Sequence, residues 1–162
     1  MDQIKMRLTQ ELLQLYGDVL SELRSRNVVR TSNLTGDYAE FLFSEAFGWK
    51  LNANSASGYD ATDDNNVKYQ IKCRKNTPTN KSRELSAFRN LNKKSFDKLA
   101  AVILDENFRV IKAALVPYNI ILEKAKHSPH VNGGRFILRD SIWDMATVED
   151  VTEKLKSKEL LI

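Results

Sequence analysis

The stretch GYDATDDNNVKYQIKCRK, residues 58–75, alternates apolar and polar side chains on both sides of the polar run Asp63-Asp64-Asn65-Asn66. Alternation with a period of two is typical of half-buried β-strands. Asp and Asn favour tight turns because their side chains hydrogen-bond to the neighbouring backbone. The stretch therefore predicts a hairpin whose strands cover residues 58–62 and 67–74.

The second strand of this hairpin has two chemically different faces. One face is apolar and is expected to meet the core, and the other is polar and basic, with Lys68, Gln70, Lys72 and Arg74. A three-residue loop over 64–66, with Asn66 left-handed, would place Asp60 opposite Gln70 and diagonal to Lys72. A four-residue loop would turn Asp60 to the other face. The register therefore decides whether these residues form a site.

With the three-residue loop, the polar face has the composition of a cation site. The Asp60 carboxylate, the Gln70 amide oxygen and the Ile71 backbone carbonyl are hard oxygen ligands that suit Mg²⁺. Lys72 can position or help to deprotonate a water and offset charge that grows on a phosphate. Glu40, on a helix upstream, can add a second carboxylate through water. These residues favour metal-assisted attack of water on a phosphodiester.

Together these residues resemble a known family. Asp60, the run Gln70-Ile71-Lys72 at the end of a hairpin strand, and a preceding helix with Glu40 in GDYAEFLF look like the PD-(D/E)xK nuclease superfamily. The resemblance covers residues 35–117 and implies a restriction-endonuclease-like fold. It also implies Mg²⁺-dependent cleavage of DNA, with Mn²⁺ as a substitute. In that family Asp60 and residue 70 would be ligands, Lys72 the catalytic lysine and Glu40 the helix acid.

The sequence departs from the family pattern at two positions. Tyr59 stands where the proline of the family name would be. Gln70 stands where Asp or Glu is usual, and this Gln-x-Lys form resembles the methyl-directed restriction branch of the superfamily.

Positive charge is concentrated next to the hairpin. The chain has a net charge of +4, but residues 65–98 carry ten Lys or Arg and two acids, so this segment has about +8 and the rest about −4. A local concentration of positive charge attracts a polyanion, and we expect DNA as the partner. The residues expected to contact DNA are Lys68, Arg74, Lys75, Lys81, Arg83, Arg89, Lys93 and Lys94.

The rest of the chain predicts a mixed α/β or α+β fold with a central mixed β-sheet flanked by helices. Helices are expected over 4–23, from Thr35 to a stop at Gly48, and over 118–126 and 147–158. A polar loop is expected over 52–57, and a loop with a short helix over 76–92. Strands are expected on either side of a turn at 105–107, ending at Pro117, and over 135–139. We expect one domain, with an N-terminal helix and connector (1–33), a core (34–117) and a C-terminal extension (118–162).

Several classes of protein do not fit the sequence. A single cysteine, Cys73, cannot form an internal disulfide, and no apolar run approaches the roughly 20 residues that a membrane span needs. The N-terminus lacks the pattern of a secretory signal, so we expect a cytoplasmic protein with no membrane partner. A glycine-rich phosphate loop is absent, so no nucleotide cofactor is expected. His127 and His130 are interpreted as loop residues rather than metal ligands.

Two functions remain open at this point. The first is a Mg²⁺-dependent DNA endonuclease, either of restriction or defence type, which the motif favours, or of repair type. It would act as a homodimer if it cuts both strands. The second is a catalytically inactive nuclease-fold module that binds DNA or a partner, because an amide replaces the usual acid at Gln70. Each residue also has a plain structural interpretation, as an exposed strand or helix residue.

Overall fold

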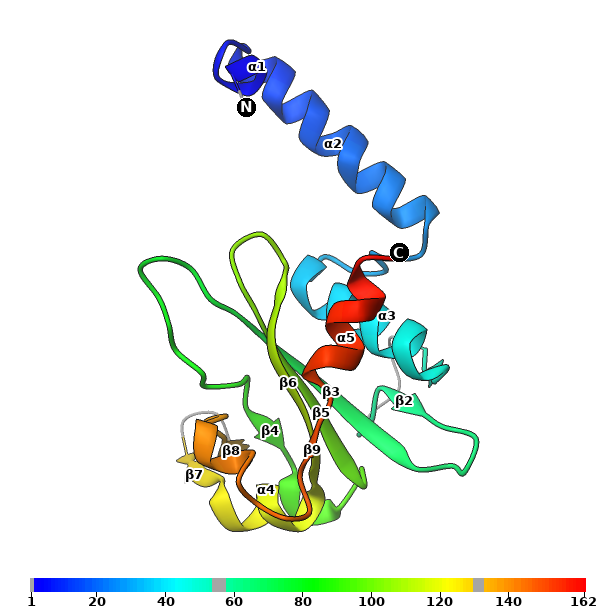
Figure 1. The fold of residues 1–162 in the computed structure, drawn as a ribbon, viewed down its shortest axis with the longest axis vertical. Helices are drawn as coiled ribbons and strands as arrows, with labels where there is room; N and C mark the ends of the chain where they lie inside the picture. The colour runs from blue at the N-terminus through cyan, green and yellow to red at the C-terminus, as the bar shows by residue number, and fades with distance from the viewer. Residues whose placement is uncertain (1, 54–57, 130–132) are drawn as a thin grey trace.

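The central feature of the fold is a six-stranded mixed sheet in the order β1-β2-β3-β5-β6-β9 (Figure 1). The computed structural model describes residues 2–53, 58–129 and 133–162. β3 and β5 are parallel, and the other neighbours are antiparallel. The predicted mixed sheet is confirmed. Its strands are β1 (Lys50–Leu51), β2 (Ala61–Thr62), β3 (Lys68–Lys75), β5 (Lys98–Leu104), β6 (Val110–Pro117) and β9 (Glu149–Asp150).

The β2–β3 hairpin has the register expected for a three-residue loop. Ala61 lies opposite Tyr69 and Thr62 opposite Lys68. Asn66 is left-handed with φ 59°, and the Asp63 carboxylate accepts the backbone N–H groups of residues 65 and 67 at 2.9 and 3.0 Å. The four-residue alternative is thereby excluded. β2 is shorter than the predicted strand over 58–62, although the Asp60 N–H still donates to the Tyr69 carbonyl at 2.7 Å.

Helices cover one face of the sheet. α3 (Leu34–Phe47) and α5 (Thr152–Glu159) lie there, over a core that includes Ala39, Phe43, Tyr69, Ile71, Val102, Leu115 and Leu155. Burial of Tyr69 and Ile71 confirms that odd-numbered residues of β3 face this core. The hairpin is thus fixed by burial on one side and by its turn at the end.

The opposite face of the sheet is also covered. α4 (Tyr118–Lys124) lies there with a small sheet of β4 (Phe88–Arg89), β8 (Gly133–Arg135) and β7 (Lys126–Ser128), in the order β4-β8-β7. Its core includes Phe88, Phe96, Leu99, Val116, Ile121, Phe136 and Leu138. The face of β3 with Gln70 and Lys72 is therefore partly enclosed rather than fully open to solvent.

Several predicted boundaries were wrong for identifiable reasons. Asn33, rather than Thr35, caps α3, because its Oδ1 accepts the Gly36 N–H at 3.1 Å, while Gly48 ends the helix as predicted with φ 70°. The helix expected over 147–158 begins only at Thr152, because residues 149–150 pair with β6.

Long-range pairing also changes the segments around the small sheet. The segment 76–92 contributes β4 and the start of the 3₁₀ helix η1 (Leu91–Lys93), and the strand expected over 135–139 forms at Gly133–Arg135. A second 3₁₀ helix, η3, covers Asp140–Ile142. His127 lies in β7, not in a loop. His130 and most of the loop expected over 52–57 lie outside the described residues.

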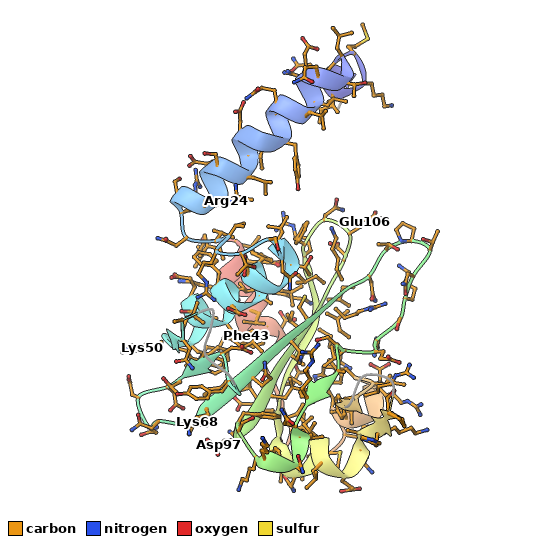
Figure 2. All side chains as sticks on the ribbon, turned by 180° about the vertical axis from the view of Figure 1, so that it is seen from behind. Arg24, Phe43, Lys50, Lys68, Asp97 and Glu106 are labelled. Carbon is orange, nitrogen blue, oxygen red and sulfur yellow. The ribbon has the colours of Figure 1, made fainter. Side chains whose placement is uncertain are left out.

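The N-terminal segment stands away from the sheet. The helix expected over 4–23 is divided into α1 (Asp2–Lys5) and α2 (Thr9–Ser25), with an extended Leu8 between them. α2 projects from the domain, and none of its described residues is buried (Figures 1 and 2). Tyr16 and Val19 on this helix are 61% and 48% exposed. Within residues 2–53, 58–129 and 133–162, no helix has the length and apolar character needed to cross a membrane.

Candidate functional site

Asp60 immediately precedes β2, and at this point its carboxylate, rather than a strand backbone, bonds to β3. Its Oδ2 accepts hydrogen bonds from Gln70 Nε2 at 2.5 Å and from the Ile71 backbone N–H at 2.6 Å. The structure therefore brings Asp60 and Gln70 together as the sequence predicted. Because the N–H and C=O of one strand residue point to the same edge, the Ile71 carbonyl also faces the edge that Asp60 occupies.

Gln70 presents its amide nitrogen to Asp60 in this arrangement. The bond orients the Asp60 carboxylate and leaves the amide oxygen of Gln70 for another contact. Its assignment as a metal ligand stays a prediction.

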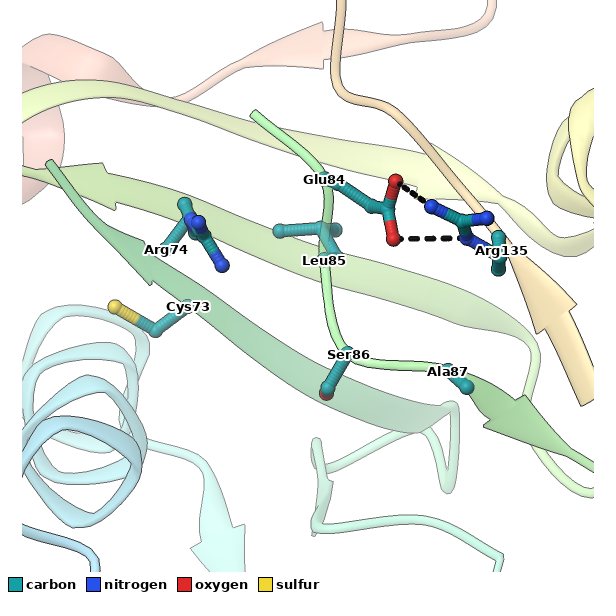
Figure 3. A pocket seen from close by; sticks show the side chains of 7 residues that line it. All are labelled: Cys73, Arg74, Glu84, Leu85, Ser86, Ala87 and Arg135. Carbon is teal, nitrogen blue, oxygen red and sulfur yellow. Dashed lines mark hydrogen bonds and ion pairs between the residues drawn. The ribbon is translucent and has the colours of Figure 1, made fainter. Parts of the chain in front are cut away.

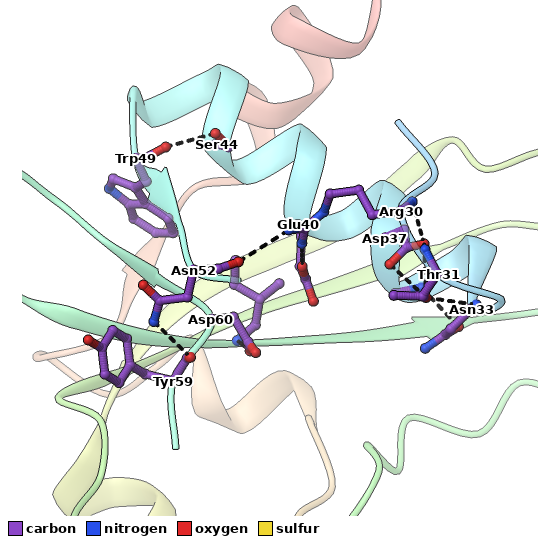
Figure 4. Close-up of polar contacts among 12 residues, drawn as sticks. Arg30, Thr31, Asn33, Asp37, Glu40, Ser44, Trp49, Asn52, Tyr59 and Asp60 are labelled. Carbon is purple, nitrogen blue, oxygen red and sulfur yellow. Dashed lines mark hydrogen bonds and ion pairs between the residues drawn. The ribbon is translucent and has the colours of Figure 1, made fainter. Parts of the chain in front are cut away.

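Glu40 projects from α3 toward the same place and forms an ion pair with Arg30 (Figure 4). Arg30 Nη1 also donates to the Asn52 carbonyl at 3.2 Å. Arg30, Glu40, Asn52 and Asp60 line one polar pocket of about 200 Å³. The pocket thus joins the two acids that the sequence singled out.

Arg30 is a residue of this pocket that the sequence did not indicate. Its position depends on the buried Asp37, whose Oδ2 accepts the backbone N–H of Arg30 at 2.9 Å and that of Thr31 at 2.6 Å. Asp37 thereby fixes the connector between α2 and α3 against the first turn of α3. In the sequence, residues 24–33 form a polar connector without periodicity, and no pattern in them predicts this contact.

The environment of the pocket disfavours the ionised forms of its two acids. Burial, followed by the nearby charge of Asp60, raises the pKa of Glu40 to about 7, and Arg30 opposes this shift. Burial raises the pKa of Asp60, against the opposing effects of the Ile71 N–H, Lys72 and Arg30. Two partly buried carboxylates side by side are costly, and Arg30 offsets only part of that cost. Such perturbed acids cluster at functional sites.

Lys72 lies on the same face of β3 as Gln70. Its Nζ donates to Ser86 Oγ at 2.9 Å and to the Ala87 carbonyl at 3.3 Å, and it lies 5.0 Å from the centroid of the Phe88 ring. Burial lowers the pKa of Lys72, Asp60 raises it, and Arg89 lowers it. The segment leading into β4 therefore holds the amine in a half-buried place near Asp60.

The oxygen donors of the pocket suit a hard divalent cation. Asp60 and Glu40 both line it, and Asp60 Oδ1 and Glu40 Oε1 have no hydrogen bond among the described residues. The described part of the chain has no group of three or more His, Cys, Asp or Glu side chains that are placed to hold a metal ion together. A cation held by two carboxylates that keeps several waters is the usual arrangement for Mg²⁺, so the donor set fits this ion.

The eight basic residues expected to contact DNA do not form one surface. Lys68 and Arg74 share the face of β3 that carries Lys72, and Arg89 is exposed on the neighbouring β4. Lys75 lies on the opposite face, with its Nζ 3.8 Å from the centroid of the Phe108 ring. Arg83 pairs with Asp140 at 2.6 Å, whereas the remaining three are exposed: Lys81, Lys93 and Lys94.

Comparison with known proteins includes a distant structural likeness. The chain is similar to a bacterial homing endonuclease, I-Ssp6803I, with a TM-score of 0.46 and 17% identity, over 82% of this chain and 92% of the other. No protein-family model matches the sequence, and no curated protein matches it. A likeness at this level says nothing about the reaction, so the site is judged on its own geometry.

Proposed function

We propose that the protein is a Mg²⁺-dependent DNA endonuclease with a Gln-x-Lys variant of the PD-(D/E)xK site. The observation that carries this proposal is the polar pocket in which Asp60 and Glu40 converge beside the half-buried Lys72. Acids with perturbed pKa values cluster at functional sites, and two carboxylates that line one pocket supply oxygen ligands for a cation.

Each residue of the site has a role in this proposal. Asp60, the Ile71 carbonyl and Glu40 would hold Mg²⁺ or Mn²⁺, which would polarise a phosphodiester and a bound water. Gln70 bonds to the Asp60 carboxylate through its amide nitrogen and would offer its oxygen as a neutral ligand. Lys72 would orient the attacking water and stabilise negative charge on the phosphate.

DNA is the proposed substrate because basic side chains lie along one face of β3 and on β4, with Lys68 and Arg89 exposed to solvent. We place the enzyme among restriction or defence nucleases on the family resemblance of its motif. Since each chain contributes one such pocket in its described part, cutting both strands would take a homodimer.

A second candidate function is a module of the same fold that binds DNA without cutting it. The observation that favours it is the ion pair between Arg30 and Glu40, because the guanidinium already neutralises the carboxylate that a metal ion would need. Gln70 also favours a module that does not cut, because it lacks the negative charge with which the usual acid would hold the metal.

A plasmid-nicking assay with Mg²⁺, Mn²⁺ or chelator separates the two functions. We expect nicking with either metal, loss of nicking in Asp60→Asn, and normal nicking in Asp64→Asn. Asp64 is an exposed acid in the turn of the same hairpin, so it is a matched control. DNA binding without nicking under all conditions would favour the non-cutting module.

A further inference from the structure

A second pocket, shown in Figure 3, is distinct from the acidic one. Ser86, one of the residues that line it, accepts a hydrogen bond from Lys72 Nζ. The pocket has a volume of about 290 Å³, and its polar lining consists of Arg74, Glu84, Ser86 and Arg135. It opens between the last part of β3 and the segment that leads into β4. The proposed reaction gives this pocket no role.

Arg74 lacks hydrogen-bond acceptors in this pocket. Its Nε is buried without a partner, and its Nη2 makes only a 3.5 Å contact with Asn80 Oδ1. Within the described residues, Arg74 forms no salt bridge, whereas Arg83 pairs with an acid at 2.6 Å. A buried donor without an acceptor is costly, and natural proteins keep such groups rarely and for a reason. The guanidinium therefore has the capacity to bind an acceptor from outside the chain.

The other charged groups of the pocket leave it net positive. Glu84 accepts two hydrogen bonds from Arg135, at 2.9 and 2.6 Å, so its charge is already balanced. Ser86 Oγ accepts from Lys72 Nζ, which leaves its hydroxyl proton free to donate. The pocket offers donors from Arg74 and Ser86 and no unpaired carboxylate, a combination that suits an anion with several oxygens.

The position of Arg74 on β3 indicates which anion the pocket would bind. Arg74 is two residues beyond Lys72 on the same face, which corresponds to roughly 6–7 Å along a strand. We propose that this pocket binds a backbone phosphate of DNA next to the phosphate that Lys72 contacts. The inference rests on the proposed function for its substrate and adds a subsite that sets the position of the strand.

The test uses binding of the full chain to short DNA duplexes without divalent metal, followed by fluorescence anisotropy. A single neutral methylphosphonate replaces each backbone phosphate in turn. We expect one position to weaken binding by the wild type about tenfold, the effect of one charge-assisted contact, and to have no effect on Arg74→Met. Arg139→Met is the matched control, because Arg139 is an exposed arginine outside the pocket, and it should keep the wild-type pattern.

Thermal unfolding separates a binding role from a structural one. Because Arg74 Nε is unpaired, Arg74→Met should unfold at the wild-type temperature or above it, whereas a structural arginine would lower that temperature. Arg74→Gln serves if methionine disturbs folding, since an amide can keep the contact with Asn80. Equal sensitivity of wild type and both variants at every phosphate position would overturn the subsite alone. DNA bound with the Arg74-dependent position, but never cut, would support the subsite and refute the proposed reaction.

Discussion

Glu40 makes the stability of the fold depend on pH. Its pKa is about 7 in the folded protein and 4.5 for the isolated group. The folded state therefore binds more protons than the unfolded state between these values, so stability falls as pH rises from about 4.5 through 7. The effect amounts to roughly 1–3 kcal/mol for a side chain that is mostly buried.

Glu40→Gln should remove most of this pH dependence while keeping an oxygen that Arg30 can bond. Chemical unfolding in chelator from pH 5 to pH 8 measures it. Glu45→Gln, which changes an exposed acid on the same helix, should keep the wild-type slope. A slope that survives in Glu40→Gln would show that another group titrates.

Gln70 controls the charge available to the cation. Its amide donates to Asp60, and a glutamate there would instead place a further negative charge beside that carboxylate. Gln70→Glu should bind Mn²⁺ more tightly than wild type without DNA, by about tenfold or more, and should be less stable in chelator. Calorimetric titration and thermal melting measure both. Unchanged Mn²⁺ affinity would remove residue 70 from the ligand set.

At the scale of helices and strands, the sequence predicted the features that depend on neighbouring residues. The Asp-Asp-Asn-Asn turn and the alternation of β3 predicted the hairpin register, because turn geometry and burial act within a few residues. β4, β8 and the late start of α5 depend on pairing with distant strands, which no local pattern encodes. For the same reason the sequence predicted Asp60 beside Gln70, but it did not predict Arg30, whose position comes from Asp37 on the next helix.

The connector between α2 and α3 depends on Asp37, which belongs to the first turn of α3. Asp37→Ala would leave the N–H groups of Arg30 and Thr31 without their acceptor in a buried place. We expect a loss of about 2–4 kcal/mol in unfolding free energy and weaker Mn²⁺ binding, because Arg30 and Glu40 would lose their alignment. Asp18→Ala, an exposed acid on α2, should change stability by less than about 0.5 kcal/mol.

At the scale of the whole molecule, the sheet divides the basic residues between two sides. Arg89→Ala, near Lys72, should lower the slope of log affinity for DNA against log salt by about 0.9, the value for one phosphate contact. Lys75→Ala, on the opposite face over Phe108, should leave the slope unchanged. Equal effects from both variants would mean that DNA lies across another surface.

α2 gives the molecule an apolar helix face that no other described part of the chain buries. Tyr16 and Val19 are exposed on the same side as Leu12 and Leu23, and none of the described residues of the helix is buried. A helix of this length, with Gly17 at its centre, is only marginally stable alone in water. A second copy of the chain is the partner that the proposed double-strand cut requires, and two such faces can cover each other.

We therefore expect a homodimer that α2 holds together. Tyr16→Glu combined with Val19→Glu should give a monomer in light-scattering and sedimentation measurements, because it places charges in the shared apolar face. Gln10→Glu combined with Ser21→Glu adds the same charge on the opposite side of the helix and should stay dimeric. The monomeric variant should still nick one strand, since each pocket lies within one chain, but should lose concerted double-strand cutting. A wild-type protein that is monomeric at micromolar concentration, with or without DNA, would rule out this role for α2.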